Sequence, residues 1–586
     1  MISTDMKTIA LESDKETNFI NDRYIWLLLI ISISVRIYLG LFTYVIKNDS
    51  VAFIQNAKYF ADGDFLSGLR HDFHPLYSFL MAVLYKAIPD MELSGTIVSI
   101  SFGTLTVIVF YLIGKSVFGR KVSFVSSVVL ALHPYAVRFS VDIISESTYF
   151  FFFISALGLG FFAIAERKYY LFALAGISSA FAYLARPEGI GIVIMVAGWC
   201  VLKDCFKIRV LWREKLTSIL VLAISFLVLS SPYLVYIKKE KGYWHLTKKK
   251  DVSQVTGINA VLKSVNDKKQ KKGSGDVPAK KKDVPLDIKA GAKLNKQSSS
   301  KPAISSDQDT IAKSNSQTIN KSTIKPMFSS ILGGIDLKKH VNSALYVGGK
   351  YLATFHLLLF VFLVIGVINW TRIKKVQYFG FYMTSIIVFY LLVLYRLHLT
   401  FAPSYQYPSR RHLIPLVIPA IFCVGIGVYA TGSWVHKKFQ FDKLKSGLRG
   451  RLRNVWIAQL LILMIIVSVL LPKTLKPQRF DKLGIKKAGQ WIREHSYKPS
   501  PAILSASVRN AYYAGGTHVQ MEHISSALSN ARAKKVDYIL ITRREYRVIE
   551  KELLQFVKDK KIVLAHKFPE GNSLNKRSML LYKVLH

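Results

Sequence analysis

Acidic and basic side chains gather beside the apolar segments of this chain, on the side of the membrane opposite the short loops rich in Lys and Arg. Carboxylates can take a proton from a nucleophile, and guanidinium groups can bind phosphate through two hydrogen bonds. A transporter would place such groups near the bilayer centre, whereas an enzyme acting on a lipid headgroup needs them at one interface. They are the carboxylates Asp49, Asp142, Glu146 and Glu188 and the bases His74, Arg186, Arg410 and Arg411.

Asp49 follows the first apolar segment, in the run Lys47-Asn48-Asp49-Ser50. At the hydrocarbon edge a carboxylate is partly desolvated and binds a proton more readily than it does in water. Such a group could act as a general base. A solvated loop carboxylate or a helix N-cap is the alternative, and it is the commoner case for an arbitrary loop Asp.

His74 precedes Pro75, a residue that suits the first turn of a helix. Its imidazole could bond a phosphate oxygen at that helix N-terminus, where backbone N–H groups favour an anion, or it could simply precede the helix.

Asp142 and Glu146 are four residues apart, so they would share a face if their segment is helical. Two carboxylates could contribute to a divalent-metal site, but the sequence offers no third ligand nearby. Capping of the following span or an ion pair with Arg138 accounts for them equally well. We therefore expect no cofactor and keep a divalent metal as the open alternative.

Arginines flank two further apolar segments. Arg186 and Glu188 follow the segment that ends at Ala185, and Tyr405, Arg410 and Arg411 precede another. These side chains could simply extend from the hydrocarbon to the interface. Short outer loops are usually poor in Lys and Arg, however, so we favour phosphate binding.

The elements that must position these residues are apolar helices. The chain is 51% hydrophobic, with repeated apolar runs of roughly 17 to 25 residues, the length that crosses a bilayer. We expect a polytopic α-helical membrane protein with about eleven spans, starting in the cytoplasm and ending outside. The apolar run 76–88 is too short to cross and predicts a helix lying at the interface.

Five parts follow from this threading: a cytoplasmic tail at 1–22, a first membrane part at 23–237 with its first outer loop at 47–92, a Lys-rich and largely flexible outer loop at 238–343, a second membrane part at 344–472, and an extracytoplasmic α/β domain at 473–586. In the last part, short apolar strands alternate with amphipathic helical segments. The expected strands are 502–506, 536–542, 562–567 and 579–584, and the expected helices are 484–495, 525–535 and 545–558.

The net charge of +44 would suggest nucleic acid as the partner of a soluble chain. Here the charge lies largely in the expected cytoplasmic loops and in the Lys-rich loop, so topology and anionic lipid account for it. The three cysteines indicate no disulfide framework. We expect the lipid bilayer, and no nucleic acid, as a partner.

Several motifs carry a family resemblance: Asn48-Asp49, Gly63-Asp64-Phe65, His74-Pro75-Leu76-Tyr77, Ala185-Arg186-Pro187-Glu188-Gly189 and Arg411-His412. Over residues 23–471 the chain resembles the glycosyltransferase-C superfamily, close to the dolichyl-phosphate-mannose protein mannosyltransferases and the bacterial aminoarabinose transferases. The resemblance implies an inverting transfer from a polyprenyl-phosphate sugar, with the acid of the first outer loop, here Asp49, as the base. Relatives often carry a second acid where this chain has Asn48, Lys-Pro-Pro where it has His74-Pro75-Leu76, and Arg-Tyr where it has Arg411-His412.

Together these features predict a membrane glycosyltransferase, outward-facing and in a bacterial or archaeal plasma membrane. It would use a polyprenyl-phosphate-linked donor and a lipid, protein or glycan acceptor. A flippase or transporter of lipid-linked sugars is the main alternative; it needs ionisable groups near mid-bilayer, of which Arg36 is the clearest. A non-catalytic envelope scaffold built around the C-terminal domain is a third.

Overall fold

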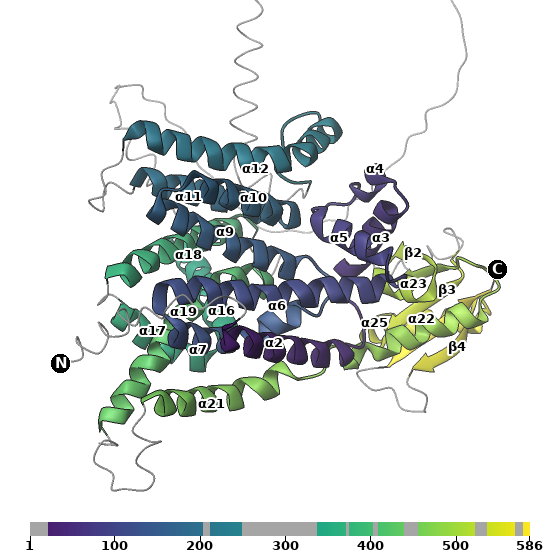
Figure 1. Cartoon of the computed structure of the whole chain (residues 1–586). Coiled ribbons are helices and arrows are strands. Elements are labelled where there is room, and N and C mark those ends of the chain that lie inside the picture. Colours follow the sequence, from purple (N-terminus) through teal and green to yellow (C-terminus); the bar gives the residue numbers. More distant parts are fainter. Residues whose placement is uncertain are drawn as a thin grey trace, which may run out of the picture. The chain divides into compact units, whose positions relative to one another are not determined.

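The computed structural model describes residues 21–202, 211–248, 337–370, 374–401, 408–438, 455–521, 536–568 and 578–585. Its contacts divide the chain into two units, Met1–Val255 with Val341–His586, and Thr256–His340. The first unit holds the helices of the membrane part and a small domain with a β-sheet (Figure 1). The expected helix at 525–535 and most of the expected Lys-rich loop lie outside the described residues.

Within the described part, seven helices are long and apolar enough to cross a membrane. They are α2 (Arg23–Leu41), α6 (Met91–Phe118), α9 (Glu146–Glu166), α12 (Trp212–Lys241), α18 (Lys374–Phe401), α19 (Arg410–Lys438) and α21 (Val455–Thr474). A pair bent by 98°, α16 (Leu337–Phe355) with α17 (Leu357–Trp370), is an eighth candidate. The multi-pass helical membrane fold is confirmed, whereas the expected number of spans is not.

Three of the eleven expected spans correspond to shorter helices. The segment expected at 122–139 is broken into α7 (Arg120–Ala131) and α8 (Pro134–Phe139), with Pro134 opening the second helix. Two others are α10 (Tyr169–Ala185) and α11 (Ile190–Leu202), which are joined by a 3-10 turn, η2 (Pro187–Gly189). Proline and its missing N–H explain why an apolar run does not continue as one helix at these points.

The central helix α19 packs closely on its neighbours. A Cβ on Gly366 of α17 would lie 1.8 Å from the carbonyl oxygen of Cys423, and one on Gly427 would lie 1.9 Å from that of Phe362. The rings of Phe110 on α6 and Phe422 on α19 stack at 3.8 Å between centroids. Small residues let helix backbones approach in this way. The middle of α19 is therefore fixed against α6 and α17.

Between α2 and α6 the chain forms α3 (Asn48–Ala61), α4 (Phe65–Gly68) and α5 (Leu76–Tyr85). The short helix predicted within 76–88 is confirmed. Phe53 of α3 meets the rings of Phe73 and Tyr77 at 4.5 and 5.2 Å, and its carbonyl accepts a hydrogen bond from Ser78. Helix α3 is thereby held on α5 by its apolar face, and its polar face is left open.

The C-terminal domain confirms the expected α/β class. Its strands are β1 (Ala502–Ser505), β2 (Thr517–Gln520), β3 (Tyr538–Thr542), β4 (Ile562–Phe568) and β5 (Met579–Val584). They form one sheet in the order β2-β1-β3-β5-β4, in which β1 is parallel to β2 and β3, and β5 is antiparallel to β3 and β4. All four expected strands are present, within two residues at each end.

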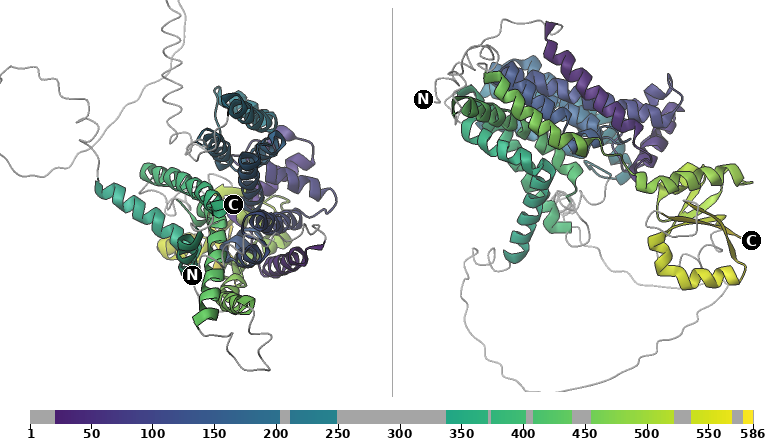
Figure 2. Two further views of the ribbon diagram at one scale, coloured as in Figure 1. Left: turned by 60° about the vertical axis from the view of Figure 1, so that its left-hand side comes forward. Right: turned by 90° about the horizontal axis from the view of Figure 1, so that it is seen from below.

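Helices cover both faces of this sheet. Figure 2 shows α22 (Leu483–His495) and α25 (Arg543–Lys558) on opposite sides of it. Leu540 packs in the core beside α22, while its neighbours Ile539 and Ile541 pack beside α25, as the alternation of a strand requires. Helix α23 (Val508–Ala514) and strand β2 were not predicted, because neither segment is long or periodic enough to stand out in the sequence.

Candidate functional site

Asp49 and Arg411 meet at the N-terminal turns of two helices. Asp49 is in the first turn of α3, Arg411 is in the first turn of α19, and Arg411 Nη1 donates to Asp49 Oδ2 at 2.6 Å. The two side chains are 37% and 36% exposed, so a ligand can reach both. The structure thus brings together the expected base and one of the expected phosphate-binding arginines.

Arg410 lies next to Arg411 at the same helix start. Its guanidinium sits over the ring of Tyr135, 4.7 Å from the centroid. Backbone N–H groups at a helix N-terminus add positive potential to the two guanidinium charges. The start of α19 is therefore suited to an anion such as phosphate. Tyr405, also expected at the site, lies outside the described residues.

Arg186 is buried and paired with two carboxylates. It lies between α10 and η2, its Nη1 donates to Glu146 at 2.9 Å, and its Nη2 donates to Glu188 at 2.9 Å. Arg186 is only 7% exposed and Glu146 only 2%. Tyr390 donates to the Glu188 carbonyl at 2.8 Å, which fixes the turn in place. In this structure the charge of Arg186 is balanced by protein carboxylates.

His74 is likewise buried, at 2% exposure. Its Nδ1 lies 2.6 Å from the carbonyl oxygen of Tyr183, and its Nε2 lies 3.4 Å from the hydroxyl of Thr247. Because a carbonyl only accepts, Nδ1 carries the hydrogen. Helix α5 begins two residues later, at Leu76, as the Pro75 signal indicated. The imidazole ties this helix start to the end of α10.

Asp142 and Glu146 do not share a helical face. Helix α8 ends at Phe139 and α9 begins at Glu146, so Asp142 lies in the link between the two helices. The four-residue spacing therefore does not place Asp142 and Glu146 on one face of a helix. Its carboxylate pairs with Lys47 at 2.7 Å and accepts a hydrogen bond from Arg479. Burial raises the pKa of this carboxyl, but the charges of Lys47 and Arg479 outweigh burial, so the pKa is below its usual range. Arg138, the other partner weighed for Asp142, donates instead to the Lys473 carbonyl.

Side chains of the C-terminal domain hold the segment before Asp49 in place. Arg479 donates to the Val45 carbonyl, and Arg509 donates to the Ile46 carbonyl at 3.2 Å. Tyr513 accepts from the Ile46 amide at 2.9 Å, and further contacts join Gln478 to Phe42 and Ser507 to Asn48. Asp142 adds to these contacts through its ion pairs with Lys47 and Arg479. We call Lys47, Asp142, Arg479, Arg509 and Tyr513 together the clamp.

Sequence reasoning missed the basic residues of the clamp. Lys47, Arg479 and Arg509 looked like ordinary loop or domain cations, and Arg479 lies 337 positions from the carboxylate it binds. No local spacing could have found that pair. A weak signal existed in Lys47 itself, a cation placed directly before the candidate base.

Metal ligands do not gather in the described part of the chain: no group of three or more His, Cys, Asp or Glu there is arranged to hold an ion. Asp142 and Glu146 have separate basic partners. That the reaction needs no cofactor stays a prediction.

Residues 72–236 match the model of the dolichyl-phosphate-mannose-protein mannosyltransferase family. That segment contains His74, Asp142, Glu146, Arg186 and Glu188. Comparison of the sequence with curated proteins gave no match.

Solved structures match over nearly the whole chain. ArnT from Cupriavidus metallidurans bound to undecaprenyl phosphate has a TM-score of 0.56 at 9% identity, covering 96% of this chain and 98% of ArnT. The Archaeoglobus fulgidus oligosaccharyltransferase tethered with an acceptor peptide has a TM-score of 0.50 at 12% identity, covering 90% of this chain and 70% of that enzyme. At such identities the likeness shows the fold.

The chain is therefore a membrane protein with the glycosyltransferase-C fold. Within that class it resembles the dolichyl-phosphate-mannose protein mannosyltransferases and ArnT, and the resemblance expected from the sequence is confirmed.

Proposed function

We propose that this protein transfers a sugar from a polyprenyl-phosphate-linked donor to an acceptor on the outer side of the membrane. The observation that carries the proposal is the contact of 2.6 Å between Asp49 and Arg411, both accessible to a ligand. It provides a possible base and a phosphate-binding cation in one place. The likeness to a structure bound to undecaprenyl phosphate supports the class of donor.

In the proposed reaction, an acceptor hydroxyl attacks C1 of the sugar from the side opposite the phosphate. The bond between C1 and the phosphate oxygen breaks, the phosphate keeps the electron pair, and Asp49 takes the hydroxyl proton. The sugar is thereby inverted at C1, and polyprenyl phosphate is released. Because phosphate leaves as an anion, cations that stabilise its charge replace a general acid.

Arg411 and Arg410 are the proposed phosphate ligands. Phosphate would compete with Asp49 for Arg411, so donor binding would release the Asp49 carboxylate toward the acceptor. Arg186 and His74 could bind phosphate only by giving up their contacts to Glu146, Glu188 and the Tyr183 carbonyl. We therefore assign His74 to fixing the start of α5 and Arg186 to fixing the turn after α10.

A lipid-binding experiment tests the donor class. Purified protein would be analysed by native mass spectrometry for co-purified lipid, and undecaprenyl phosphate would then be titrated into protein reconstituted in nanodiscs. We expect a polyprenyl-phosphate mass and saturable binding that Arg411→Ala weakens at least about tenfold. Failure of undecaprenyl phosphate to bind the wild-type protein would contradict the proposal.

The flippase alternative predicts a different result. A flippase would move lipid-linked sugar from one leaflet to the other in vesicles that contain the protein, and no new glycosidic bond would form. Arg36, buried at 2% exposure within α2, is the residue that favours it, but its Nη1 donates to the carbonyl and hydroxyl oxygens of Ser32 on the same helix. Transport that persists in an Asp49→Asn variant would support this alternative.

A further inference from the structure

Helix α16 runs across the direction of the helix that follows it. The chain turns by 98° between α16 and α17. The turn falls at His356, whose φ of 76° lies in the left-handed region that favours glycine. A residue other than glycine keeps this conformation where the surrounding structure holds it. Figure 2 shows α16 extending away from the bundle, so the bend is a fixed feature that turns this helix sideways.

The contacts of α16 place it at one end of the bundle. Tyr346 stacks on His398, in the last turn of α18, with 4.4 Å between the ring centroids. Tyr351 donates a hydrogen bond of 3.3 Å to the carbonyl of Leu416, in the second turn of α19. Because α19 begins at the candidate site, α16 packs at the same end of the bundle, which we call the site end.

The length of α17 leaves room for a helix lying flat. Helix α17 has 14 residues, from Leu357 to Trp370, so it covers about 21 Å of the roughly 30 Å of hydrocarbon. It ends just before Arg372, Lys374 and Lys375, a basic run typical of a cytoplasmic loop, which marks the surface opposite the site end. About 9 Å remains between the start of α17 and the surface at the site end, and a flat helix is about 10 Å across. Helix α16 fits this layer when it lies in the plane of the membrane.

One side of α16 is apolar and exposed. Val341, Leu345 and Leu352 are 48%, 68% and 43% exposed. Together with Gly348 they recur every three or four residues, so they form one face of the helix. An apolar face of this kind marks a surface that contacts a partner or a membrane.

The other two sides of α16 are packed and polar. Ser343 and Val347 are buried on the side that faces the bundle. Asn342, Tyr346 and Lys350 follow one another at four-residue spacing on a third side. Lys350 Nζ donates to the Tyr346 hydroxyl at 3.1 Å, which keeps its charge on that side. A helix lying at a membrane surface beside a protein needs these three sides, one each for protein, hydrocarbon and lipid headgroups.

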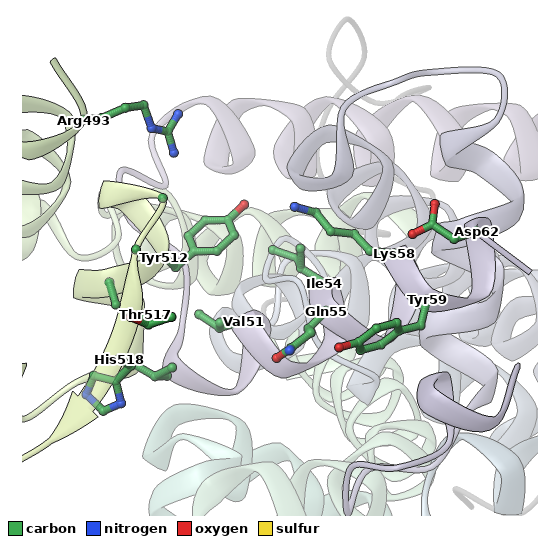
Figure 3. Close-up of a pocket in the computed structure, with 14 residues that line it drawn as sticks. Val51, Ile54, Gln55, Lys58, Tyr59, Asp62, Arg493, Tyr512, Thr517 and His518 are labelled. Carbon is green, nitrogen blue, oxygen red and sulfur yellow. The ribbon is translucent and has the colours of Figure 1, made fainter. Parts of the chain in front are cut away.

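A groove of about 650 Å³ between α3 and the C-terminal domain has the opposite character (Figure 3). Its walls carry the charged side chains of Lys58, Asp62 and Arg493, and all three are exposed. Charges of this kind keep their hydration, so water reaches this groove. Thr517, exposed at the start of β2 in the same groove, therefore gives a reference position in water.

We propose that α16 lies in the plane of the membrane, with Val341, Leu345 and Leu352 in contact with the acyl chains of the leaflet at the site end and Lys350 at the level of the headgroups. Helices α16 and α17 then form a corner rather than an eighth straight span. The proposal goes beyond the transfer reaction and does not depend on it. A lipid held at Arg411 would have its chain in the same leaflet as this face.

Reaction of single cysteines with N-ethylmaleimide tests the proposal in the full-length protein, with one copy in each nanodisc. The thiolate is the reacting form, and hydrocarbon raises the pKa of a thiol. Cys200, Cys205 and Cys423 are replaced by Ala in every variant. Two variants probe the apolar face and two probe the adjacent polar side: Leu345→Cys, Leu352→Cys, Asn342→Cys and Ala353→Cys, all at exposed positions.

Two further variants set the scale. Ile224→Cys, at an exposed apolar position of α12, is the reference in hydrocarbon, and Thr517→Cys is the reference in water. In addition, a bimane fluorophore attached to Leu345→Cys is tested for quenching by lipids that carry a nitroxide on the acyl chain. The melting temperature of each variant, compared with that of the protein lacking cysteine, checks that the fold is kept.

We expect Leu345→Cys and Leu352→Cys to react at least about a hundredfold more slowly than Asn342→Cys and Ala353→Cys, because a rise of about 2 in the pKa of a thiol lowers its thiolate fraction by this factor. The bimane at position 345 should be quenched by the nitroxide lipid.

Three results would overturn the proposal. Rates at all four positions equal to that of Thr517→Cys would place the helix in water. Rates at all four equal to that of Ile224→Cys would place both sides in hydrocarbon, as in a broken span. Slow reaction at position 345 without quenching would show that protein, rather than lipid, covers the face. The nanodiscs contain no polyprenyl phosphate, so none of these results bears on the proposed function.

Discussion

Arg411 donates a hydrogen bond to Asp49 at 2.6 Å across 362 positions of sequence. The contact joins the first turn of α3 to the first turn of α19, the most deeply packed of the candidate spans. Helix α3 is thus tied to a closely packed part of the bundle at the residue proposed to act as base. The contact also implies that Asp49 is engaged until something anionic displaces it.

Asp49→Asn should abolish transfer and leave the fold intact. The amide keeps the shape of the side chain but cannot take the proton, so we expect a loss of about 10² to 10⁴-fold in the transfer rate. Asp49 is 37% exposed, so the change in melting temperature should be small. Transfer at the wild-type rate would remove Asp49 from the mechanism.

Arg411→Ala should weaken the binding of undecaprenyl phosphate by about ten- to a hundredfold, because one charge-assisted contact is lost. Arg411→Lys should bind with intermediate affinity, since Lys keeps the charge but cannot form the bidentate hydrogen bonds of a guanidinium group. Arg23→Ala, at an exposed position of α2, is the control and should leave affinity unchanged. Titration in nanodiscs measures all three; equal affinities throughout would count against phosphate binding at α19.

Arg186→Ala should act mainly on stability. The variant leaves Glu146, 2% exposed, buried beside Glu188 without its cation. Removing one partner of a buried ion pair costs about 3–5 kcal/mol. We expect a clearly lower melting temperature in detergent, partly restored when Glu146→Gln is added. A variant as stable as the wild type that has lost phosphate binding would instead place Arg186 among the phosphate ligands.

Asp142 should make stability sensitive to acid. Its pKa in the folded protein is lowered from the ordinary value of 3.8, so the unfolded chain binds the proton first as the pH falls. The stabilisation is therefore fully present above about pH 4 and is lost as the pH falls through the lowered pKa. Asp142→Asn should lower the melting temperature at pH 7. Between pH 5 and the lowest pH that the protein tolerates, the melting temperature of this variant should fall less than that of the wild type.

The exposed Asp481 offers a control for this experiment. Asp481→Asn should leave both the melting temperature at pH 7 and its acid dependence as in the wild type. A parallel acid dependence in Asp142→Asn and wild type would show that the clamp does not govern acid stability.

Local patterns in the sequence determined the class of the protein. Apolar runs long enough to cross a bilayer, the short helix at Leu76–Tyr85 and four of the five strands of the C-terminal sheet follow from hydrophobic length and period within a few residues. The number of spans did not follow, because Pro134 divides the run at 122–139 into two short helices, and because α10 and α11 are only 17 and 13 residues long.

Only the tertiary structure decided which of the candidate residues meet. It paired Asp49 with Arg411, gave Arg186 to Glu146 and Glu188, and bound Asp142 to Lys47 and Arg479. Periodicity constrains neighbours within a helix or strand, whereas these contacts depend on how distant helices pack.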